Sequence, residues 1–253
     1  MEASGGRIRV GIGGWTFAPW RGVFYPRGLR QKDELAFTSQ RLGVIEINAT
    51  YHSLQSAESF ERWAKETPDD FVFTIKGSRF VSNRRRLADA KEGLARFLGQ
   101  GLGALGSKLG PILWQLMPTK VFDCEDMARF LDLMPDSLDG LPLRHAIEPR
   151  HQSFAEPTFL SLCAERGIAV CLSDDERWPL DEAGGNSFTY ARLLRSRSEE
   201  ASGYAPGDLD RWAGRFMAEA RAGRDVFAFF IGGAKEKAPA AALALMDRVS
   251  TSP

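Results

Sequence analysis

Eight short runs rich in β-branched and apolar residues recur along the chain, with helix-type periodicity in several of the gaps between them. The runs span residues 8–13, 44–48, 71–76, 112–116, 143–148, 168–173, 187–193 and 225–230. Apolar residues at helical spacing occupy 94–105, 127–134, 209–217 and 242–249. Strands that alternate with helices predict parallel pairing through right-handed crossovers, and eight such units predict a closed (β/α)8 barrel, an α/β fold of the TIM type.

The turn after the first run argues against an open dinucleotide-binding sheet. Residues 11–17 read GIGGWTF, which lacks both the GxGxxG spacing and the helix start of that fold. We find no GxxxxGK[ST] loop, no internal repeat and no Pro-, Gly- or Ser-rich linker. We therefore expect one barrel domain over residues 7–248, with a disordered tail at 1–6 and a C-terminal tail at 249–253.

Polar side chains fall at the carboxyl ends of the predicted strands, although the buried strands of a parallel barrel are normally apolar. In the second run, Glu46 and Asn48 alternate away from isoleucines that should face the helices. Other strands end in the same way, with Lys76, Gln115, Glu148, Arg150, Asp174 and Arg192. This end of a barrel carries the active site of barrel enzymes, so we expect one polar site there. In the first strand, Gly11 and Gly13 are predicted to leave room for a ligand.

For any one pair of these charged residues, a structural role is as well supported as a functional one. Glu46 with Lys76, or Glu148 with Arg192, would then form buried salt bridges that hold the barrel together. The whole set, gathered at one end, favours a site. The run at residues 187–193 also carries its charged residue, Arg192, near its carboxyl end.

Several neighbouring residues have simpler interpretations. Arg79 is an expected anion contact, whereas the arginines at 84–86 fit a solvated helix face. His145 alternates onto the helix side and is predicted to be a core histidine, while His52 and His151 lie just past strand ends and stay open candidates. The aromatic segment that begins at Trp15 fits both a packed loop and a wall for a ligand.

Composition narrows the class of partner. Lysine plus arginine and aspartate plus glutamate each total 33, so no overall basic field favours nucleic acid. The sequence has no secretion signal and no apolar run long enough for a membrane span, and its three cysteines are widely spaced. We expect a cytoplasmic protein with reduced thiols, without a membrane partner, and we leave its oligomeric state open.

The order and spacing of several segments resemble the YecE-like family, catalogued as domain of unknown function 72. These segments are GGWTF, GVIEINATYH, FTIKGSRFVSNRRRL, KLGPILWQL, RHAIEPRHQSF, GIAVCLSD and TYARL, within residues 7–248. The resemblance implies a (β/α)8 barrel with a polar pocket at its rim, and it implies no particular reaction. The residues implied for that pocket are Trp15, Glu46, Asn48, Lys76, Gln115, Glu148, Arg150, His151, Asp174 and Arg192.

The chain departs from the pattern of this family at three places. Members usually carry a histidine where this chain has Asn83, and RLHG where this chain reads RLLR at residues 192–195. After the eighth strand they usually show two asparagines, whereas this chain has Ile231, Gly232 and Gly233. These departures imply either a different substrate or a site that has lost its chemistry.

We expect a metal-independent acid/base enzyme of the isomerase, lyase or hydrolase type, without a cofactor, acting on a small anionic or sugar-like molecule. The catalytic candidates are Glu46, Lys76, Glu148 and Asp174, and the substrate-binding candidates are Trp15, Asn48, Tyr51, Arg79, Gln115, Arg150, His151 and Arg192. The two glutamates come from nearly opposite strands of the ring and are expected to act on two faces of one substrate.

Two alternatives remain at this stage. In the first, a divalent metal is held by Glu46, Glu148, Asp174 and His151, although the nearby lysine and arginine would repel it. In the second, the protein is a non-catalytic ligand sensor or interaction protein. We also expect Glu46, Lys76, Glu148 and Arg192 to share one solvent-reachable pocket, where Arg192→Ala would weaken anion binding with little change in melting temperature.

Overall fold

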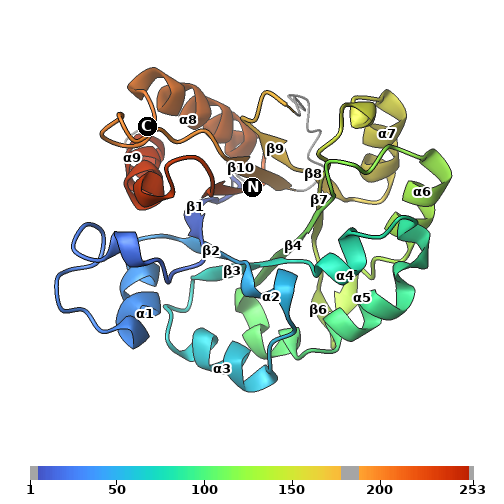
Figure 1. Cartoon of the computed structure of the whole chain (residues 1–253), viewed down its shortest axis with the longest axis horizontal. Helices are drawn as coiled ribbons and strands as arrows, with labels where there is room; N and C mark the ends of the chain where they lie inside the picture. Colours follow the sequence, from blue (N-terminus) through green and yellow to red (C-terminus); the bar gives the residue numbers. More distant parts are fainter. Residues whose placement is uncertain (1–4, 178–187, 251–253) are drawn as a thin grey trace.

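A ring of parallel strands surrounded by helices forms the centre of the computed structural model, which describes residues 5–177 and 188–250 (Figure 1). The ring contains β1 (Ile8–Gly13), β2 (Val44–Ile47), β3 (Val72–Lys76), β4 (Leu109–Gln115), β7 (His145–Glu148), β8 (Ala169–Val170), β9 (Leu172–Ser173), β10 (Phe188–Leu193) and β11 (Asp225–Phe230). Each of the eight predicted runs contributes to it, the sixth as the two pieces β8 and β9. Residues 1–4 of the expected N-terminal tail, residue 187 and residues 251–253 lie outside the described residues.

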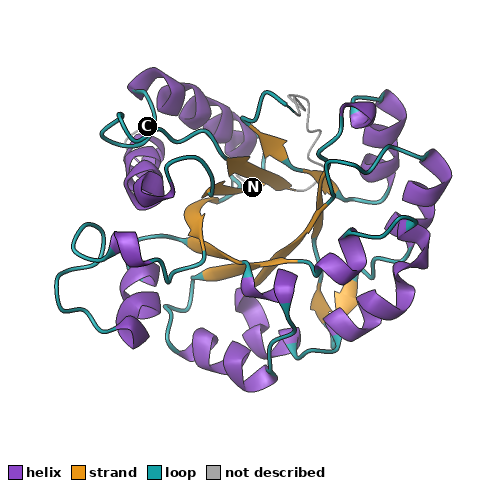
Figure 2. Cartoon of the chain, in the orientation of Figure 1, coloured by secondary structure: helices purple, strands orange, loops and turns teal. Residues whose placement is uncertain are grey.

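The ring closes through the sixth run. The strand order is β8-β7-β4-β3-β2-β1-β11-β10-β9, and every pair in it is parallel. Since only Cys171 separates β8 from β9, the segment that pairs with β7 on one side pairs with β10 on the other. Figure 2 shows this ring enclosed by helices. The predicted (β/α)8 barrel is confirmed.

Helices lie outside the ring and cover it. They are α1 (Glu34–Ser39), α2 (Ala49–His52), α3 (Ala57–Lys65), α4 (Arg79–Ser82), α5 (Lys91–Leu98), α6 (Cys124–Asp132), α7 (Pro157–Glu165), α8 (Pro206–Arg221) and α9 (Ala238–Ser250). The four predicted helical periodicities fall on α5, α6, α8 and α9. The periodicity at 94–105 extends past the end of α5, which stops at Leu98 with Gly99 as its C-cap. Gly101, with a φ of 100° that favours glycine, then redirects the chain.

Short 3-10 segments and one hairpin complete the described chain. The 3-10 segments are η1 (Ala18–Trp20), η2 (Gln31–Asp33), η3 (Leu87–Ala90), η4 (Leu102–Lys108), η5 (Gln152–Phe154) and η6 (Lys235–Lys237). The antiparallel hairpin β5 (Ser137–Leu138) and β6 (Leu141–Pro142) forms a separate sheet. Strand β4 begins three residues before its predicted start, and Gly110 permits this, because a Cβ there would lie 2.6 Å from Val72 Cγ1.

Alternation along the strands divides the apolar residues into two cores. Inside the ring lie Val44, Val72, Leu113, Ala146, Ala169, Cys171, Phe188, Tyr190, Phe227 and Phe229. Between the ring and the helices lie their sequence neighbours, such as Ile45, Phe73 and Ile147. His145 is part of this outer region, as predicted, and its ring nitrogens contact Trp114 Nε1 at 3.2 Å and Pro135 O at 2.9 Å. Two residues further along a strand, the next inward-facing side chain therefore lies at the carboxyl end of the barrel.

The predicted ligand space beside Gly11 is not present. A Cβ at this position would lie 1.8 Å from Val44 O, so the glycine admits the backbone of β2 instead. A Cβ at Gly13 would lie 2.8 Å from Asn48 Nδ2, at the carboxyl end of the ring. Only the second of the two glycines therefore borders the barrel mouth.

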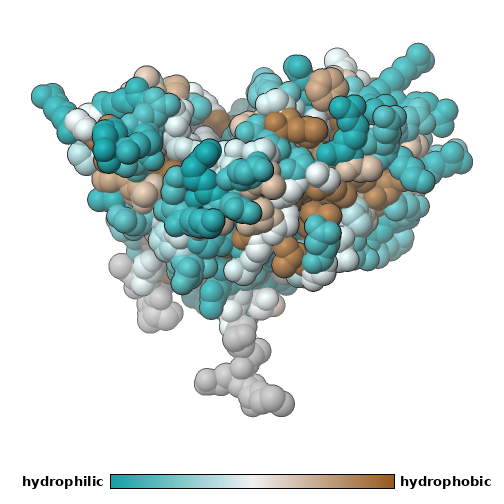
Figure 3. All heavy atoms as spheres, turned by 90° about the horizontal axis from the view of Figure 1, so that it is seen from below, coloured by the Kyte–Doolittle hydropathy of each residue, from teal (hydrophilic) through white to brown (hydrophobic). Residues whose placement is uncertain are grey.

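The outer surface is mostly hydrophilic, with scattered apolar residues, in the view of Figure 3. Among the described residues, no helix combines the length and the apolar character needed to cross a membrane.

Candidate active site

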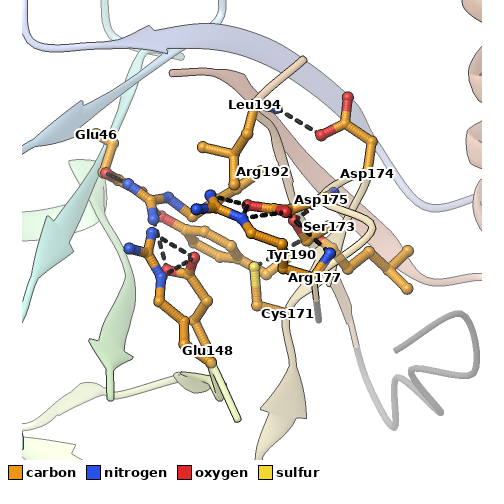
Figure 4. Close-up of polar contacts among 12 residues, drawn as sticks. Glu46, Glu148, Cys171, Ser173, Asp174, Asp175, Arg177, Tyr190, Arg192 and Leu194 are labelled. Atoms are coloured by element: carbon orange, nitrogen blue, oxygen red, sulfur yellow. Dashed lines mark hydrogen bonds and ion pairs between the residues drawn. The ribbon is translucent and has the colours of Figure 1, made fainter. Parts of the chain in front are cut away.

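Glu46, Glu148 and Arg192 meet inside the ring near the carboxyl ends of β2, β7 and β10. Arg192 Nη1 donates to Glu148 Oε2 at 2.5 Å, and its Nη2 donates to Glu46 Oε1 at 3.2 Å. At most 3% of any of these three side chains is exposed. The Glu148–Arg192 salt bridge considered from the sequence is thus present, and Glu46 pairs with Arg192 instead of Lys76. In Figure 4 both carboxylates point toward the guanidinium.

The remaining carboxylate oxygens are also occupied by donors. Tyr190 Oη donates to Glu46 Oε2 at 2.7 Å, and Arg150 donates to Glu148 Oε1 from Nε at 3.1 Å and from Nη2 at 2.9 Å. We call these five residues the charge network. Burial would raise the pKa of Glu148, but the positive charges around it hold that pKa below its ordinary value. The expected placement of the two glutamates on opposite faces of a substrate is therefore not what the structure shows.

A pocket of about 490 Å³ opens at the carboxyl ends of the strands. We call it the mouth pocket, and its lining includes Trp15, Asn48, His52, Lys76, Arg192, Ile231 and Lys235. Trp15 packs edge-on against Trp63, with ring centroids 5.2 Å apart, and Asn48 Nδ2 donates to Glu46 O at 3.4 Å. Of the sequence-predicted residues, the structure thus brings Trp15, Asn48, Lys76 and Arg192 together around one space.

Lys76 is the least constrained charged group of the mouth pocket that the sequence predicted. Its Nζ lies 4.5 Å from the centre of the Tyr51 ring, and it has no hydrogen-bond or ion-pair partner within residues 5–177 and 188–250. The Tyr51 hydroxyl in turn accepts from Asn83 Nδ2 at 3.0 Å. Burial and the nearby Arg192 lower the pKa of Lys76 to about 8.

Lys235, which sequence reasoning missed, supplies a second lysine to the pocket. Its Nζ lies 4.5 Å from the centre of the Phe17 ring, and it too lacks a hydrogen-bond or ion-pair partner in the described part of the chain. Trp20, which is buried in the packed aromatic loop, donates from Nε1 to Lys235 O at 3.0 Å. Burial lowers the pKa of Lys235. Its position after the eighth strand was the available signal, because this rim carries barrel sites.

Two buried polar atoms at the barrel mouth have no hydrogen-bond partner among the described residues. They are Arg192 Nε, a donor, and Gln115 Oε1, an acceptor. Gln115 pairs in register with Glu148 at the end of β4. Buried polar atoms are rarely left without a partner, and an ordered water is the usual partner of such atoms.

Asp174 lies apart from the mouth pocket. Its oxygens accept from Leu194 N and from Tyr204 Oη, both at 2.6 Å, and Figure 4 shows it turned toward Leu194. It borders two other depressions of about 390 Å³ each, on the side of Arg195 and Trp212. Burial raises the pKa of Asp174. The structure does not bring this carboxylate together with Lys76.

Two further predicted contacts also lie elsewhere. Arg79 is exposed on α4, where its guanidinium lies 5.3 Å from the centre of the Phe80 ring. His151 caps η5, with its Nδ1 2.8 Å from Ser153 Oγ. Neither residue is in the lining of the mouth pocket.

The ligand set considered for a divalent metal does not converge. The oxygens of Glu46 and Glu148 bind the donors of the charge network, while Asp174 and His151 have separate partners. Among the described residues, no group of three or more His, Cys, Asp or Glu side chains is placed to hold a metal ion. The donor set present at the mouth therefore does not fit a divalent cation.

Comparison with known proteins identifies the family of this chain. A family model described as "Protein of unknown function DUF72" matches residues 9–253. The chain is 27% identical to the UPF0759 protein YunF of Bacillus subtilis over 158 residues, which are 60% of this chain and 54% of that protein. It is 26% identical to the UPF0759 protein YecE of Escherichia coli over 149 residues, 58% of this chain and 50% of that protein. The chain spans about half the length of these curated relatives.

Among solved structures, a DUF72 family protein from Thermotoga maritima has a similar fold. The TM-score is 0.74 at 21% sequence identity, and the match covers 95% of this chain and 97% of that chain. At this identity, the likeness shows the fold alone.

Proposed function

The chain belongs to the DUF72 family of proteins of unknown function, and we propose that it is an acid/base enzyme acting on a small anionic substrate in the mouth pocket. One observation carries the proposal: Lys76, Lys235 and Arg192 line this pocket, and no carboxylate is among the described residues of its lining. Cations in a partly desolvated pocket hold an anion more strongly than cations at the surface do.

The charge network leaves the two lysines as excess positive charge. Glu46 and Glu148 contribute two negative charges, and Arg150 and Arg192 contribute two positive charges that are bonded to them. The lysines are therefore not neutralised by these glutamates. This balance supports anion binding without protonation of either glutamate.

Lys76 is the group best suited to proton transfer. Its pKa of about 8 is close to neutral pH, which is where a general acid or base works best. In this proposal Lys76 exchanges a proton with the substrate, Lys235 holds the anionic group, and the buried Arg192 adds positive charge beneath the pocket. Glu46 and Glu148 act on the substrate only through the arginine that they position.

Binding measurements test the anion site. Titration calorimetry with inorganic phosphate should show binding that Lys76→Met and Lys235→Met each weaken by about tenfold, the scale of one charge-assisted hydrogen bond. The exposed Lys91 on α5 provides the matched control, because Lys91→Met should leave the affinity unchanged. Equal affinity of both pocket variants and the wild type would contradict the proposal.

Solvent exchange tests the acid/base role. A panel of phosphorylated and carboxylated sugars in D2O is followed by NMR, and we expect the wild type to incorporate deuterium into at least one member while Lys76→Met does not. A second candidate, non-catalytic ligand binding, is favoured by the apolar Ile231 in the pocket lining. Anion binding without exchange in any member would support that candidate.

A further inference from the structure

We propose that Lys76 is an amine nucleophile that forms an imine with a small aldehyde or ketone, whose anionic group Lys235 holds. The inference rests on the proposed function, since it places the substrate in the same mouth pocket, and it adds the chemical class of that substrate. Both lysines line this one space of about 490 Å³.

The surroundings of Lys76 differ from those of the buried lysines with structural roles. Lys108 Nζ donates to Ala64 O at 2.6 Å and to Thr67 O at 2.7 Å, and Lys120 Nζ donates to Asp126 at 2.6 Å. Lys76 Nζ has no such acceptor among the described residues, so it does not need to stay protonated and can present a lone pair to the pocket.

Burial, more than neighbouring charge, favours the neutral amine of Lys76. Burial, then Arg192 and Arg150, lower the pKa of Lys76, and the two glutamates only partly oppose this. With a pKa of about 8, the neutral fraction at pH 7 is about two orders of magnitude larger than that of an ordinary lysine. The cation–π contact with Tyr51 favours the ammonium, but a single contact of this kind is the weaker effect.

The two lysines have different environments and therefore different roles. Burial is the cause that lowers the pKa of Lys235, without a contribution from a cation among the described residues. Its Nζ also lies over two rings, at 4.5 Å from the centre of Phe17 and 5.8 Å from that of Trp20, which favour the charged form. Lys235 is thus suited to hold an anion, and Lys76 to attack a carbonyl carbon.

The reaction balances without a redox partner. The Nζ lone pair of Lys76 forms a bond to the carbonyl carbon, and the π electrons move to the oxygen, whose negative charge the nearby Arg192 guanidinium stabilises electrostatically. The oxygen takes up protons and leaves as water while the nitrogen loses its protons, so that amine plus carbonyl gives imine plus water. His52, in the same lining, can carry the transferred proton. Once protonated, the imine acidifies the adjacent C–H bond, and in this proposal His52 accepts the proton that leaves, so that Lys76 takes part in the acid/base step as the imine nitrogen.

Reductive trapping tests the inference. The wild type is incubated at pH 7 with glyoxylate, a small anionic aldehyde, and with cyanoborohydride, which reduces an imine to a stable secondary amine. Peptide mass spectrometry then measures the labelling of each lysine. We expect Lys76 to be labelled at least about tenfold faster than the exposed Lys91, because more of it is neutral. Labelling of Lys76 no faster than that of Lys91 would overturn the inference.

A variant and a second probe test the division between the lysines. Lys235→Met should slow the labelling of Lys76 by glyoxylate but not by acetaldehyde, which carries no anionic group. An equal effect on both probes would show that Lys235 does not hold the anion. If phosphate binds the mouth pocket and Lys76 stays unlabelled, the imine chemistry is wrong and the proposed function stands. If phosphate neither binds nor slows labelling at Lys76, the proposed anion site itself is wrong.

Discussion

Replacing Arg192 by methionine should destabilise the protein strongly, because the substitution leaves two buried carboxylates without their shared donor. Glu46 Oε1 and Glu148 Oε2 both lose a guanidinium hydrogen bond in a place where at most 3% of either side chain is exposed. Breaking a buried ion pair from one side costs about 3–5 kcal/mol. For a chain of this length this corresponds to a melting temperature lower by about 6–20 °C.

The pH dependence of the melting temperature shows whether Arg192→Met destabilises the protein through lost charge or through lost packing. In the wild type the pKa of Glu148 is lowered, so its contribution to stability is present at neutral pH and is lost as the pH falls through that lowered pKa. In Arg192→Met the Glu148 carboxylate loses this stabilising charge, so it takes up a proton at a higher pH than in the wild type. The difference in melting temperature between variant and wild type should therefore narrow between pH 7 and pH 5.

Thermal unfolding followed by circular dichroism measures both effects. The control adds Glu46→Gln and Glu148→Gln to Arg192→Met, which removes the buried charges together and should recover much of the lost stability. A single Arg192→Met variant that melts within about 2 °C of the wild type and loses phosphate binding would refute this reasoning. Arg192 would then be a ligand contact, as the sequence suggested when it predicted little effect on melting. The observed bonds to both glutamates are the reason for reversing that expectation.

Two further substitutions test local parts of the fold. Asp126 accepts from Leu87 N at 3.0 Å, Ala88 N at 2.9 Å and Lys120 Nζ at 2.6 Å, so Asp126→Asn should cost about 1.5–3 kcal/mol at pH 7 in urea unfolding. The pKa of Asp126 is lowered, so this cost should disappear as the pH falls through it, and a cost independent of pH would contradict the account. Gly11→Ala places a Cβ 1.8 Å from Val44 O and should lower stability by about 1–3 kcal/mol. Gly214→Ala on α8 is the control, because a Cβ there meets nothing within 4 Å and should not lower stability. Equal melting temperatures for the two variants would refute the close approach of β1 and β2.

The predictable part of the fold is the part that a short-range pattern determines. The strands were found because alternation and β-rich composition are local properties, and the same alternation placed Glu46, Glu148 and Arg192 on the inner face. The partner of each charge was not predictable, since it depends on which strands lie across the ring from one another. Helix α1, with six residues, is too short to show a clear period.

Residues beyond the strand ends escaped prediction for a different reason. Strand β9 ends at Ser173, so alternation no longer fixes the direction of Asp174, which turns toward Tyr204. The loop that carries Lys235 depends on Gly233, with a φ of 60° and a Cβ position 2.1 Å from Ser196 O. Such long-range packing between loops leaves no periodic signal in the sequence.

The charge network also constrains how this barrel can change during evolution. A substitution at Glu46, Glu148 or Arg192 leaves a buried charge without its partner, so these positions have to change together or remain as they are. His52 and Lys235 line the mouth pocket together with Arg192, but they do not belong to the charge network. Single substitutions at the rim of the mouth pocket can therefore change which ligand it binds, while the charge network beneath the pocket stays the same.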